Sequence, residues 1–565
     1  MIKIIKNLYK AFNIEDKKKL LLISLFLLFS VIFESLSIGI LIPVFKLILD
    51  PGQSNLFLTS YFPFIVSYFE PENYAYFLLF SVFIIFVIKF CVILTLTYLQ
   101  FNFGFYLHNR LTKKILGKIT NLNLESYYKT HTSKATKILA TEIDQFVGST
   151  VALLIFINEI LVITALVIIM FLLNFRFTSL LILIFVFSFL IYNFFLKKII
   201  TNLGVKRSKY EGLKFRSLLE YFNNYFEINI YDKIKLFQNR FIDSSVERNY
   251  SFKWLRFYQN LPRVFFEFYI LIIFVFTAIY IKLLNINFEE IFIIGGIYVV
   301  CAFRMIPSFN KSIQSTQTLK FLKPAIKNIN DVLCIKHKKI KSTKLKFKNQ
   351  IKLEGFSFKY ENIQKIIFKN CNIEILKNEI IAIKGESGSG KSTLINILLG
   401  YLKPNRGNIY VDNKRFLKNE TYRFNVGYVP QTATLLDESL RENILFGREY
   451  KKDRFEKVIY ACNLKKFYKD NSKTKNRVLG ERGKSVSGGQ RQRIMIARAL
   501  YDDPEIIIFD EFSSSLDSEN ERKILLNLKK ILKNKTVIFI THSKNVENFC
   551  KKVYLVEKNK IKKIK

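Results

Sequence analysis

Gly385-Glu-Ser-Gly-Ser-Gly-Lys-Ser392 is the stretch that decides the fold of the second half of this 565-residue chain. It follows a β-branched run, Glu379–Lys384, and precedes the apolar positions of a helix. The pattern G-x-x-x-x-G-K-S/T suits phosphate, because its glycines let backbone amides turn inward around an anion. We expect Lys391 to reach the outer phosphates of a nucleotide and the Ser392 hydroxyl to ligate Mg²⁺.

The helix after this stretch directs its positive end at the phosphates. We therefore predict one continuous set of nucleotide contacts, made by Gly385, Glu386, Ser387, Gly388, Ser389, Gly390, Lys391, Ser392 and Thr393. The predicted cofactors are ATP and Mg²⁺.

A second strand, Ile506–Phe509, ends in Asp510 and Glu511. Two carboxylates after a strand are, taken alone, more often a polar strand end. Beside a phosphate loop, Asp510 is predicted to hold the Mg²⁺ shell. Glu511 is then the candidate base that polarises the attacking water.

Between these motifs lies Val486-Ser-Gly-Gly-Gln490, followed by Arg491-Gln-Arg493 and a helix. This segment resembles the signature of the ATP-binding cassette (ABC) family, and the motifs occur in the family's order. The resemblance covers essentially the whole chain, as six membrane spans followed by one cassette. It implies an enzyme that couples ATP hydrolysis to transmembrane transport.

The resemblance implies further roles at matching positions. Tyr360 matches the aromatic that stacks on adenine, Gln431 the glutamine that senses Mg²⁺, and His542 the switch histidine near the γ phosphate. A lone histidine after an apolar strand is usually structural, so only the ordered set favours a catalytic His542. Glu481 matches an exporter loop, and Asp517, in Ser515-Leu-Asp517, matches the loop that crosses the dimer interface.

Departures from the family pattern are mild. Val486 stands where leucine is usual, and Phe512 replaces a small residue after the base. Thr541-His-Ser543 replaces the usual Ala-His-Arg. None of these changes removes a catalytic group, so we expect hydrolysis to be intact.

Family ATP sites are shared between two cassettes, and the resemblance therefore implies a dimer. The partner's signature, here Ser487, Gly488, Gly489 and Gln490, caps the γ phosphate with a helix amino terminus. Since this chain has one cassette, we expect a homodimer, with a heterodimer as the alternative.

The first half of the chain has the composition of a membrane protein. The whole chain is 50% hydrophobic and 15% aromatic. Windows of about 20 apolar residues predict six spans, at 20–46, 74–104, 147–173, 178–200, 262–284 and 288–311. The segment Leu56–Phe69 between the first two is either a short helix at the outer interface or an ordinary loop.

Loop charges predict the orientation. Residues 47–73 contain no Lys or Arg, whereas 107–146 carry seven. Basic loops stay cytoplasmic, so both termini are expected inside a bacterial cytoplasmic membrane. The formal charge of +42 first suggests nucleic acid, but no reading motif accompanies it, and we predict no nucleic-acid partner.

The predicted fold class is therefore a membrane α-helical bundle of the ABC exporter type, fused to an α/β P-loop ATP-binding cassette. The expected domains are a transmembrane domain over 1–325, a lysine-rich linker over 326–350 and a cassette over 351–565. The cytoplasmic connections are expected to be helical. The six cysteines form no Cys-x-x-Cys pair and are expected to be free thiols.

Basic residues inside the spans suggest an anionic substrate. A cation at the bilayer centre costs on the order of 2.5–3.5 kcal/mol, so a functional reason is expected for Lys89, Arg263, Arg304 and Lys311. In the alternative interpretation these cations pair with Glu34, Glu159 and Glu267, or mark the membrane boundary.

Three segments resemble the PglK-type flippases of bacterial N-linked glycosylation, namely Phe33–Phe45, Leu261–Arg263 and Arg304–Lys311. The resemblance implies an ATP-driven flippase of a polyprenyl-pyrophosphate-linked oligosaccharide. The alternative within transport is export of another lipid, a drug or a peptide. Only 19 residues precede the first span, so no amino-terminal peptidase domain is expected. A nucleic-acid-associated ATPase and an ATP-gated channel are the hypotheses of other classes.

Overall fold

A computed structural model describes most of the chain. The described residues are 2–41, 44, 74–121, 132–173, 175–284, 288–335, 341–360, 365–412, 414–416, 420–432, 434–473, 478–479, 486–512, 521, 525–526, 528–529 and 531–565. Those before residue 336 form one compact unit, and those from 341 on form another. The segment Leu56–Phe69 lies outside the described residues.

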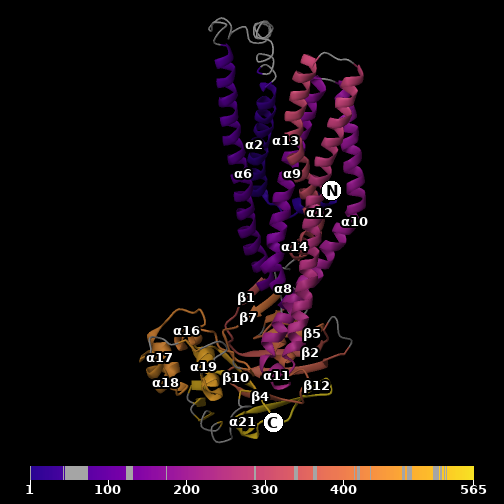
Figure 1. The fold of residues 1–565 in the computed structure, drawn as a ribbon. Helices are drawn as coiled ribbons and strands as arrows, with labels where there is room; N and C mark the ends of the chain where they lie inside the picture. The colour runs from indigo at the N-terminus through magenta and orange to yellow at the C-terminus, as the bar shows by residue number, and fades with distance from the viewer. Residues whose placement is uncertain are drawn as a thin grey trace. The chain divides into compact units, whose positions relative to one another are not determined.

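The first unit is helical (Figure 1). Its elements are α1 (Ile2–Tyr9), α2 (Ile14–Gly39), α6 (Tyr74–Thr120), α8 (Thr132–Lys137), the π-helix η2 (Ile138–Glu142), α9 (Ile143–Leu173), α10 (Phe175–Asn223), α11 (Tyr225–Ile230), α12 (Ile234–Leu284), α13 (Phe288–Phe321) and α14 (Lys323–Leu333).

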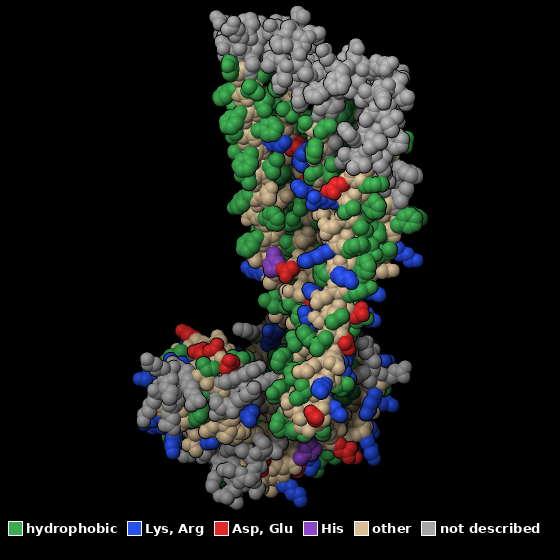
Figure 2. All heavy atoms as spheres, viewed as in Figure 1, with side chains coloured by type: hydrophobic (Ala, Val, Ile, Leu, Met, Phe, Trp, Pro, Cys, Tyr) green, Lys and Arg blue, Asp and Glu red, His purple; other side chains and the backbone are tan. Residues whose placement is uncertain are grey.

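Each predicted span falls in, or overlaps, one of the long helices α2, α6, α9, α10, α12 and α13. Within the part of the chain that the structure describes, three helices are long and apolar enough to cross a membrane, at 14–39, 76–120 and 132–172. Hydrophobic side chains cover much of the visible surface of these helices (Figure 2). Such a surface is stable in lipid and would aggregate in water.

Helix α2 begins at Ile14, six residues before the first predicted span, and its amino terminus is capped. The Asn13 side chain accepts a hydrogen bond from the Asp16 amide at 2.8 Å, and the Asp16 carboxylate accepts one from the Asn13 amide at 2.7 Å. This reciprocal cap satisfies two backbone donors. Arg110 of α6 pairs with Asp16 at 2.7 Å, which fixes α2 against α6.

The helices continue well past the predicted spans, as expected for helical connections. α10 runs to Asn223, and α12 begins at Ile234. Ion pairs hold this polar region together, for example Lys137 with Glu142 at 2.9 Å and Arg248 with Glu211 at 2.8 Å.

The helical unit extends to about residue 336, beyond the expected boundary at residue 325. Helix α14 occupies the start of the predicted linker, and Ile326, Ile329 and Val332 are buried in the core of the helical unit. The lysine-rich composition of 336–350 predicted a linker, but the apolar stripe of α14 before it buries against neighbouring helices.

The second unit is an α/β fold. Its strands are β1 (Lys341–Lys344), β2 (Gln350–Phe358), β3 (Phe368–Leu376), β4 (Ile380–Lys384), β5 (Arg406–Val411), β6 (Lys414–Phe416), β7 (Glu420–Arg423), β8 (Val426–Val429), β9 (Ile506–Asp510), β10 (Thr536–Ile540), β11 (Lys552–Glu557) and β12 (Lys560–Lys563). Its helices are α15 (Lys391–Leu398), α16 (Leu440–Leu445), α17 (Lys452–Ala461), α18 (Lys465–Lys473), α19 (Gly488–Leu500) and α21 (Lys544–Phe549).

One sheet of this unit has the order β12-β11-β4-β10-β9-β8, in which the strands from β11 to β8 run parallel. A second sheet, β3-β2-β5-β6, is antiparallel. The β-branched runs of the parallel strands are buried, as expected for a sheet covered on both faces. Phe509 and Phe539 stack between β9 and β10 with ring centroids 4.9 Å apart.

Candidate functional site

The predicted catalytic motifs meet at one edge of the parallel sheet. Ile540 of β10 stands opposite Ile383 of β4 on one side and Asp510 of β9 on the other, and Val429 of β8 stands opposite Phe509. The four carboxyl ends are therefore neighbours. In open α/β sheets, ligands bind at the carboxyl ends of the strands.

The phosphate loop leaves β4 at Gly385 and enters α15 at Lys391. Gly390, before the helix, has φ +105°, and a Cβ there would stand 2.6 Å from Ile367 Cγ2. Only glycine fits this position. Nothing lies within 4 Å of where a side chain at Gly388 would begin. The loop is thus tightly packed at Gly390, where it enters α15, and open at Gly388 among the described residues.

Lys391 is buried at the base of this loop. Its ammonium donates to the Gly385 carbonyl at 2.6 Å and the Glu386 carbonyl at 3.1 Å, and lies 3.3 Å from His542 Nε2. Ser389 Oγ is buried and has no hydrogen-bond partner among the residues described. An orphaned hydroxyl beside an ammonium is the donor set that fits a phosphate.

Glu511 lies between two other predicted residues. Gln431 donates from Nε2 to Glu511 Oε2 at 2.5 Å, and His542 Nε2 lies 3.9 Å from Glu511 Oε1. Glu511 has φ +46°, a conformation that costs an ordinary residue about 1–3 kcal/mol and that clusters at functional sites. The structure thus brings Lys391, His542, Glu511 and Gln431 into one chain of contacts.

Asp510 accepts a hydrogen bond from the Tyr428 hydroxyl at 2.9 Å. Burial raises the pKa of the Asp510 carboxyl above its ordinary value, and the bond from Tyr428 opposes this shift. Sequence reasoning missed Tyr428. The available signal was an aromatic with a polar tip near the end of a short apolar strand, directly before the Pro-Gln of 430–431.

The residues present fit a Mg²⁺ ion of the nucleotide-bound kind. Ser392 is in the first turn of α15, Gln431 follows β8, and Asp510 is the last residue of β9. Mg²⁺ prefers oxygen ligands and is commonly held by one or two carboxylates together with water and substrate phosphates. Among the described residues no group of three or more His, Cys, Asp or Glu side chains could hold a metal by itself.

Tyr360 lies beside the phosphate-loop helix. Its hydroxyl is 3.1 Å from Thr393 Oγ1, and its ring packs edge-on against Phe358 with centroids 5.0 Å apart. This contact places an aromatic next to the nucleotide loop, where the resemblance assigned adenine stacking.

The signature segment forms the amino terminus of α19. Ser487 Oγ accepts from the Gln490 amide at 3.3 Å, and Gln490 Oε1 accepts from the Ser487 amide at 3.0 Å. A side chain at Gly488 or Gly489 would meet nothing within 4 Å. The two glycines therefore face open space at a positive helix end. Asp517 and Glu481 lie outside the described residues.

Phe512, the departure after Glu511, is a core residue. It is 1% exposed and packs against Phe509 and Phe539, with centroids 5.0 and 5.7 Å away. Gln492 of α19 donates to its carbonyl at 2.5 Å. The ring of Phe512 thus packs on β9 and β10, while its backbone carbonyl links the signature helix α19 to the segment after β9.

In the helical unit, two of the four predicted substrate residues come together. Lys89 of α6 lies 3.1 Å from Glu34 Oε1 of α2, and Arg304 of α13 contacts the same oxygen. Lys89 also donates to Ser37 Oγ at 3.0 Å. Two cations thus share one buried carboxylate, and one positive charge is in excess.

The other two residues form separate pairs. Arg263 lies 2.8 Å from Glu267 on the exposed surface of α12, and Lys311 lies 3.5 Å from Glu159. All four cations thus have the carboxylate partners of the alternative interpretation, Glu34, Glu159 and Glu267. The structure does not bring all four cations into one cluster; instead, basic and acidic side chains alternate along the unit (Figure 2).

Site and fold together define a P-loop nucleotide-binding unit joined to a membrane unit of long helices. Two family models match, one described as the ABC transporter transmembrane region over residues 20–300 and one as ABC transporter over 368–514. They cover about three quarters of the chain. The chain belongs to the ABC transporter family, and the predicted fold class is confirmed.

A solved structure described as a bacterial Atm1-family ABC exporter with ATP bound has the same fold. It aligns with a TM-score of 0.78 and 16% identity, over 97% of this chain and 95% of that one. This likeness and both family models give the chain the fold of an ABC exporter half-transporter, with one transmembrane region followed by one nucleotide-binding unit.

Curated relatives include leukotoxin translocation ATP-binding proteins named LktB. One from Pasteurella haemolytica-like sp. (strain 5943B) is 39% identical over 216 residues, 37% of this chain and 30% of the relative. One from Mannheimia haemolytica is 38% identical over 219 residues, 38% of this chain and 31% of the relative. The chain is thus matched over less than a third of the length of these relatives.

Proposed function

We propose that this protein is an ATP-driven exporter that works as a homodimer in a bacterial cytoplasmic membrane, with both termini inside. The observation that carries the proposal is the contact chain Lys391–His542–Glu511–Gln431 at the end of the parallel sheet. It joins four motifs that are far apart in sequence and occurs in a chain with an exporter fold.

The roles of these residues follow from their chemistry. Glu511 accepts a proton from the attacking water. Gln431 donates a hydrogen bond to the Glu511 carboxylate and so orients it toward that water. Lys391 and His542 donate to the γ phosphate, where negative charge develops. Ser392, Gln431 and Asp510 hold Mg²⁺, which when bound neutralises phosphate charge.

A second copy of the chain completes each site. Ser487 with the open Gly488 and Gly489 presents a helix amino terminus that suits a γ phosphate. Among the residues that the structure describes, nothing lies within 4 Å of where a side chain at either glycine would begin, which leaves room for a partner's nucleotide. Asp517 is assigned to the same interface by resemblance alone. ATP binding closes the two cassettes and hydrolysis reopens them.

For the substrate, we propose a polyprenyl-pyrophosphate-linked oligosaccharide that is moved to the outer leaflet. The support is the Lys89–Glu34–Arg304 cluster, which carries one excess positive charge within the helical bundle. An isolated charge in lipid is costly and marks a functional site by default. A pyrophosphate group is the anion that such a cluster attracts.

The second candidate is export of a peptide or protein. It is favoured by the relatives, whose names describe leukotoxin translocation. These matches cover less than two fifths of this chain. They therefore support ATP-driven transport more than they support a particular substrate.

Reconstitution into proteoliposomes separates the two candidates. We expect ATP to move a fluorescent lipid-linked oligosaccharide to the opposite leaflet, and the Glu511→Gln variant to leave it in place. Transport of a labelled peptide with no movement of the lipid would replace the flippase proposal with the peptide exporter.

A further inference from the structure

The polar end of the helical unit contains a cavity of about 470 Å³. It lies between α8, α10 and α14, and none of the predicted substrate residues lines it. Its volume falls in the range of small-molecule sites, about 300–1,000 Å³. Its position is cytoplasmic in the predicted orientation, because Val205, its residue nearest the membrane on α10, comes five residues after the predicted span.

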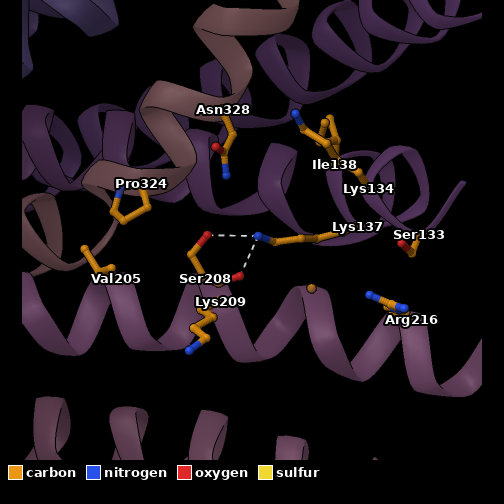
Figure 3. Close-up of a pocket in the computed structure, with 11 residues that line it drawn as sticks. Ser133, Lys134, Lys137, Ile138, Val205, Ser208, Lys209, Arg216, Pro324 and Asn328 are labelled. Carbon is orange, nitrogen blue, oxygen red and sulfur yellow. Dashed lines mark hydrogen bonds between the residues drawn. The ribbon is translucent and has the colours of Figure 1, made fainter. Parts of the chain in front are cut away.

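The lining of this cavity is cationic. Its lining residues include Lys134 and Lys137 of α8 and Lys209 and Arg216 of α10, and none of the described lining residues is Asp or Glu. Figure 3 shows Lys134 and Lys137 on one helix, Arg216 on the facing helix, and Lys209 extending away from Lys137 at the rim. Asn328 of α14 adds an amide.

Two of the four cations already have carboxylate partners. Lys137 is held by Glu142 at 2.9 Å and by Ser208, to which it donates at 2.6 and 2.9 Å (Figure 3). Arg216 pairs with Glu220 at 2.7 Å on the exposed side. Lys134 and Lys209 have no carboxylate partner among the described residues, so the cavity keeps an excess of positive charge.

The cavity is formed by specific packing. The Lys137 side chain packs over Gly212, where a Cβ would lie in ordinary contact at 3.7 Å from Lys137 Cδ, and crosses to Ser208. Lys137 is followed by a π-helical turn, Ile138–Glu142, and such turns are frequent at functional sites. The turn brings Glu142 back onto the Lys137 ammonium, which is thereby fixed in the cavity wall.

We propose that this cavity binds a phosphate group carried by a small molecule or by a lipid headgroup. Its volume exceeds the needs of a bare ion, and its lining combines cations with the apolar side chains of Ile138, Val205 and Pro324. Lysines recognise phosphate as point charges, and an arginine fork adds directed hydrogen bonds. The site is independent of the ATP site and of the proposed transport substrate.

The test measures binding of inorganic pyrophosphate to the full chain in detergent by calorimetry. All proteins carry Lys391→Gln, which weakens pyrophosphate binding at the phosphate loop equally in every sample. We expect Lys134→Gln with Lys209→Gln to weaken pyrophosphate binding at least tenfold. The matched pair Lys206→Gln with Lys327→Gln removes two exposed lysines of α10 and α14 outside the cavity lining and should change binding less than twofold.

A second variant guards against an indirect effect of charge. Val205→Trp fills the cavity without changing charge and should give the same loss. The proposal is overturned if the cavity pair and the matched pair bind alike, or if Val205→Trp binds normally.

Pyrophosphate affinity in nanodiscs of two lipid compositions distinguishes a lipid headgroup from a soluble phosphate ester. If phosphatidylglycerol, compared with phosphatidylcholine, lowers the pyrophosphate affinity of the protein with an intact cavity but not of the cavity pair, a lipid headgroup occupies the site. If the affinity is the same in both lipids, the ligand is a soluble phosphate ester. Both results sustain the site.

Discussion

At the scale of single residues, Glu511 determines what the nucleotide unit can do. Its carboxylate contacts Gln431 and His542, and its backbone has a positive φ of +46° directly after β9. A general base contributes about 10²–10⁴-fold to rate. The neighbouring Asp510, which accepts a hydrogen bond from Tyr428, is the carboxylate that we propose for Mg²⁺.

Glu511→Gln should therefore bind ATP normally and lose at least about 100-fold in hydrolysis. The amide keeps the shape of the side chain but cannot take a proton. Phosphate release and nucleotide binding measure the two properties separately. Glu449→Gln, at an 84% exposed side chain, is the control and should hydrolyse at the parent rate. Unchanged turnover in Glu511→Gln would remove the base assignment.

Cysteine reactivity offers a second test at this scale. Burial raises the pKa of the Cys462 and Cys550 thiols to about 12, and the thiolate is the reactive form. At pH 8 these two thiols are almost fully protonated and shielded, whereas Cys334 is exposed. Iodoacetamide should label Cys334 before Cys462 and Cys550, as measured by mass spectrometry. Early labelling of Cys462 would show that the core of the nucleotide unit opens.

At the scale of elements, sequence reasoning worked where a motif is local. The phosphate loop and the Asp510–Glu511 strand end were predictable because neighbouring residues define them. The Tyr428–Asp510 bond was not, since it depends on β8 lying beside β9. Likewise, the meeting of Lys89 and Arg304 on Glu34 joins three helices, and no periodicity within one helix encodes it.

The phosphate loop makes a prediction about packing. Gly390→Ala should destabilise the nucleotide unit more than Gly388→Ala, although both residues have positive φ. A left-handed alanine costs about 1–2 kcal/mol at either position, but only the Cβ at 390 meets Ile367, at 2.6 Å. Thermal unfolding of the full chain measures the difference. Adding Ile367→Ala to Gly390→Ala should restore part of the loss; no restoration would contradict the packing argument.

The Glu34 cluster makes a parallel prediction in the helical unit. Glu34→Gln leaves Lys89 and Arg304 without a negative partner, and breaking a buried ion pair costs about 3–5 kcal/mol. We expect a clearly lower unfolding temperature in detergent. Glu267→Gln, which breaks the exposed pair with Arg263, is the matched control and should change little, since exposed pairs contribute little. Equal effects of the two variants would show that the cluster does not hold α2, α6 and α13 together.

At the scale of the whole molecule, each chain supplies one set of catalytic side chains and one signature. The hydroxyl of Ser487 accepts a hydrogen bond within its own helix cap. Among the described residues, nothing lies within 4 Å of where a side chain at Gly488 or Gly489 would begin. In the proposed dimer, the signature of one copy supplies donors to the γ phosphate bound by the other. The proposal also has nucleotide binding close the membrane helices.

Counting copies in active particles tests this claim most directly. Fluorescently tagged protein is reconstituted into nanodiscs, particles with one and two copies are separated and counted by photobleaching, and ATP hydrolysis is measured for each. We predict that hydrolysis resides in the two-copy particles and that one-copy particles are nearly inactive. Full hydrolysis per chain in one-copy particles would contradict the shared-site account.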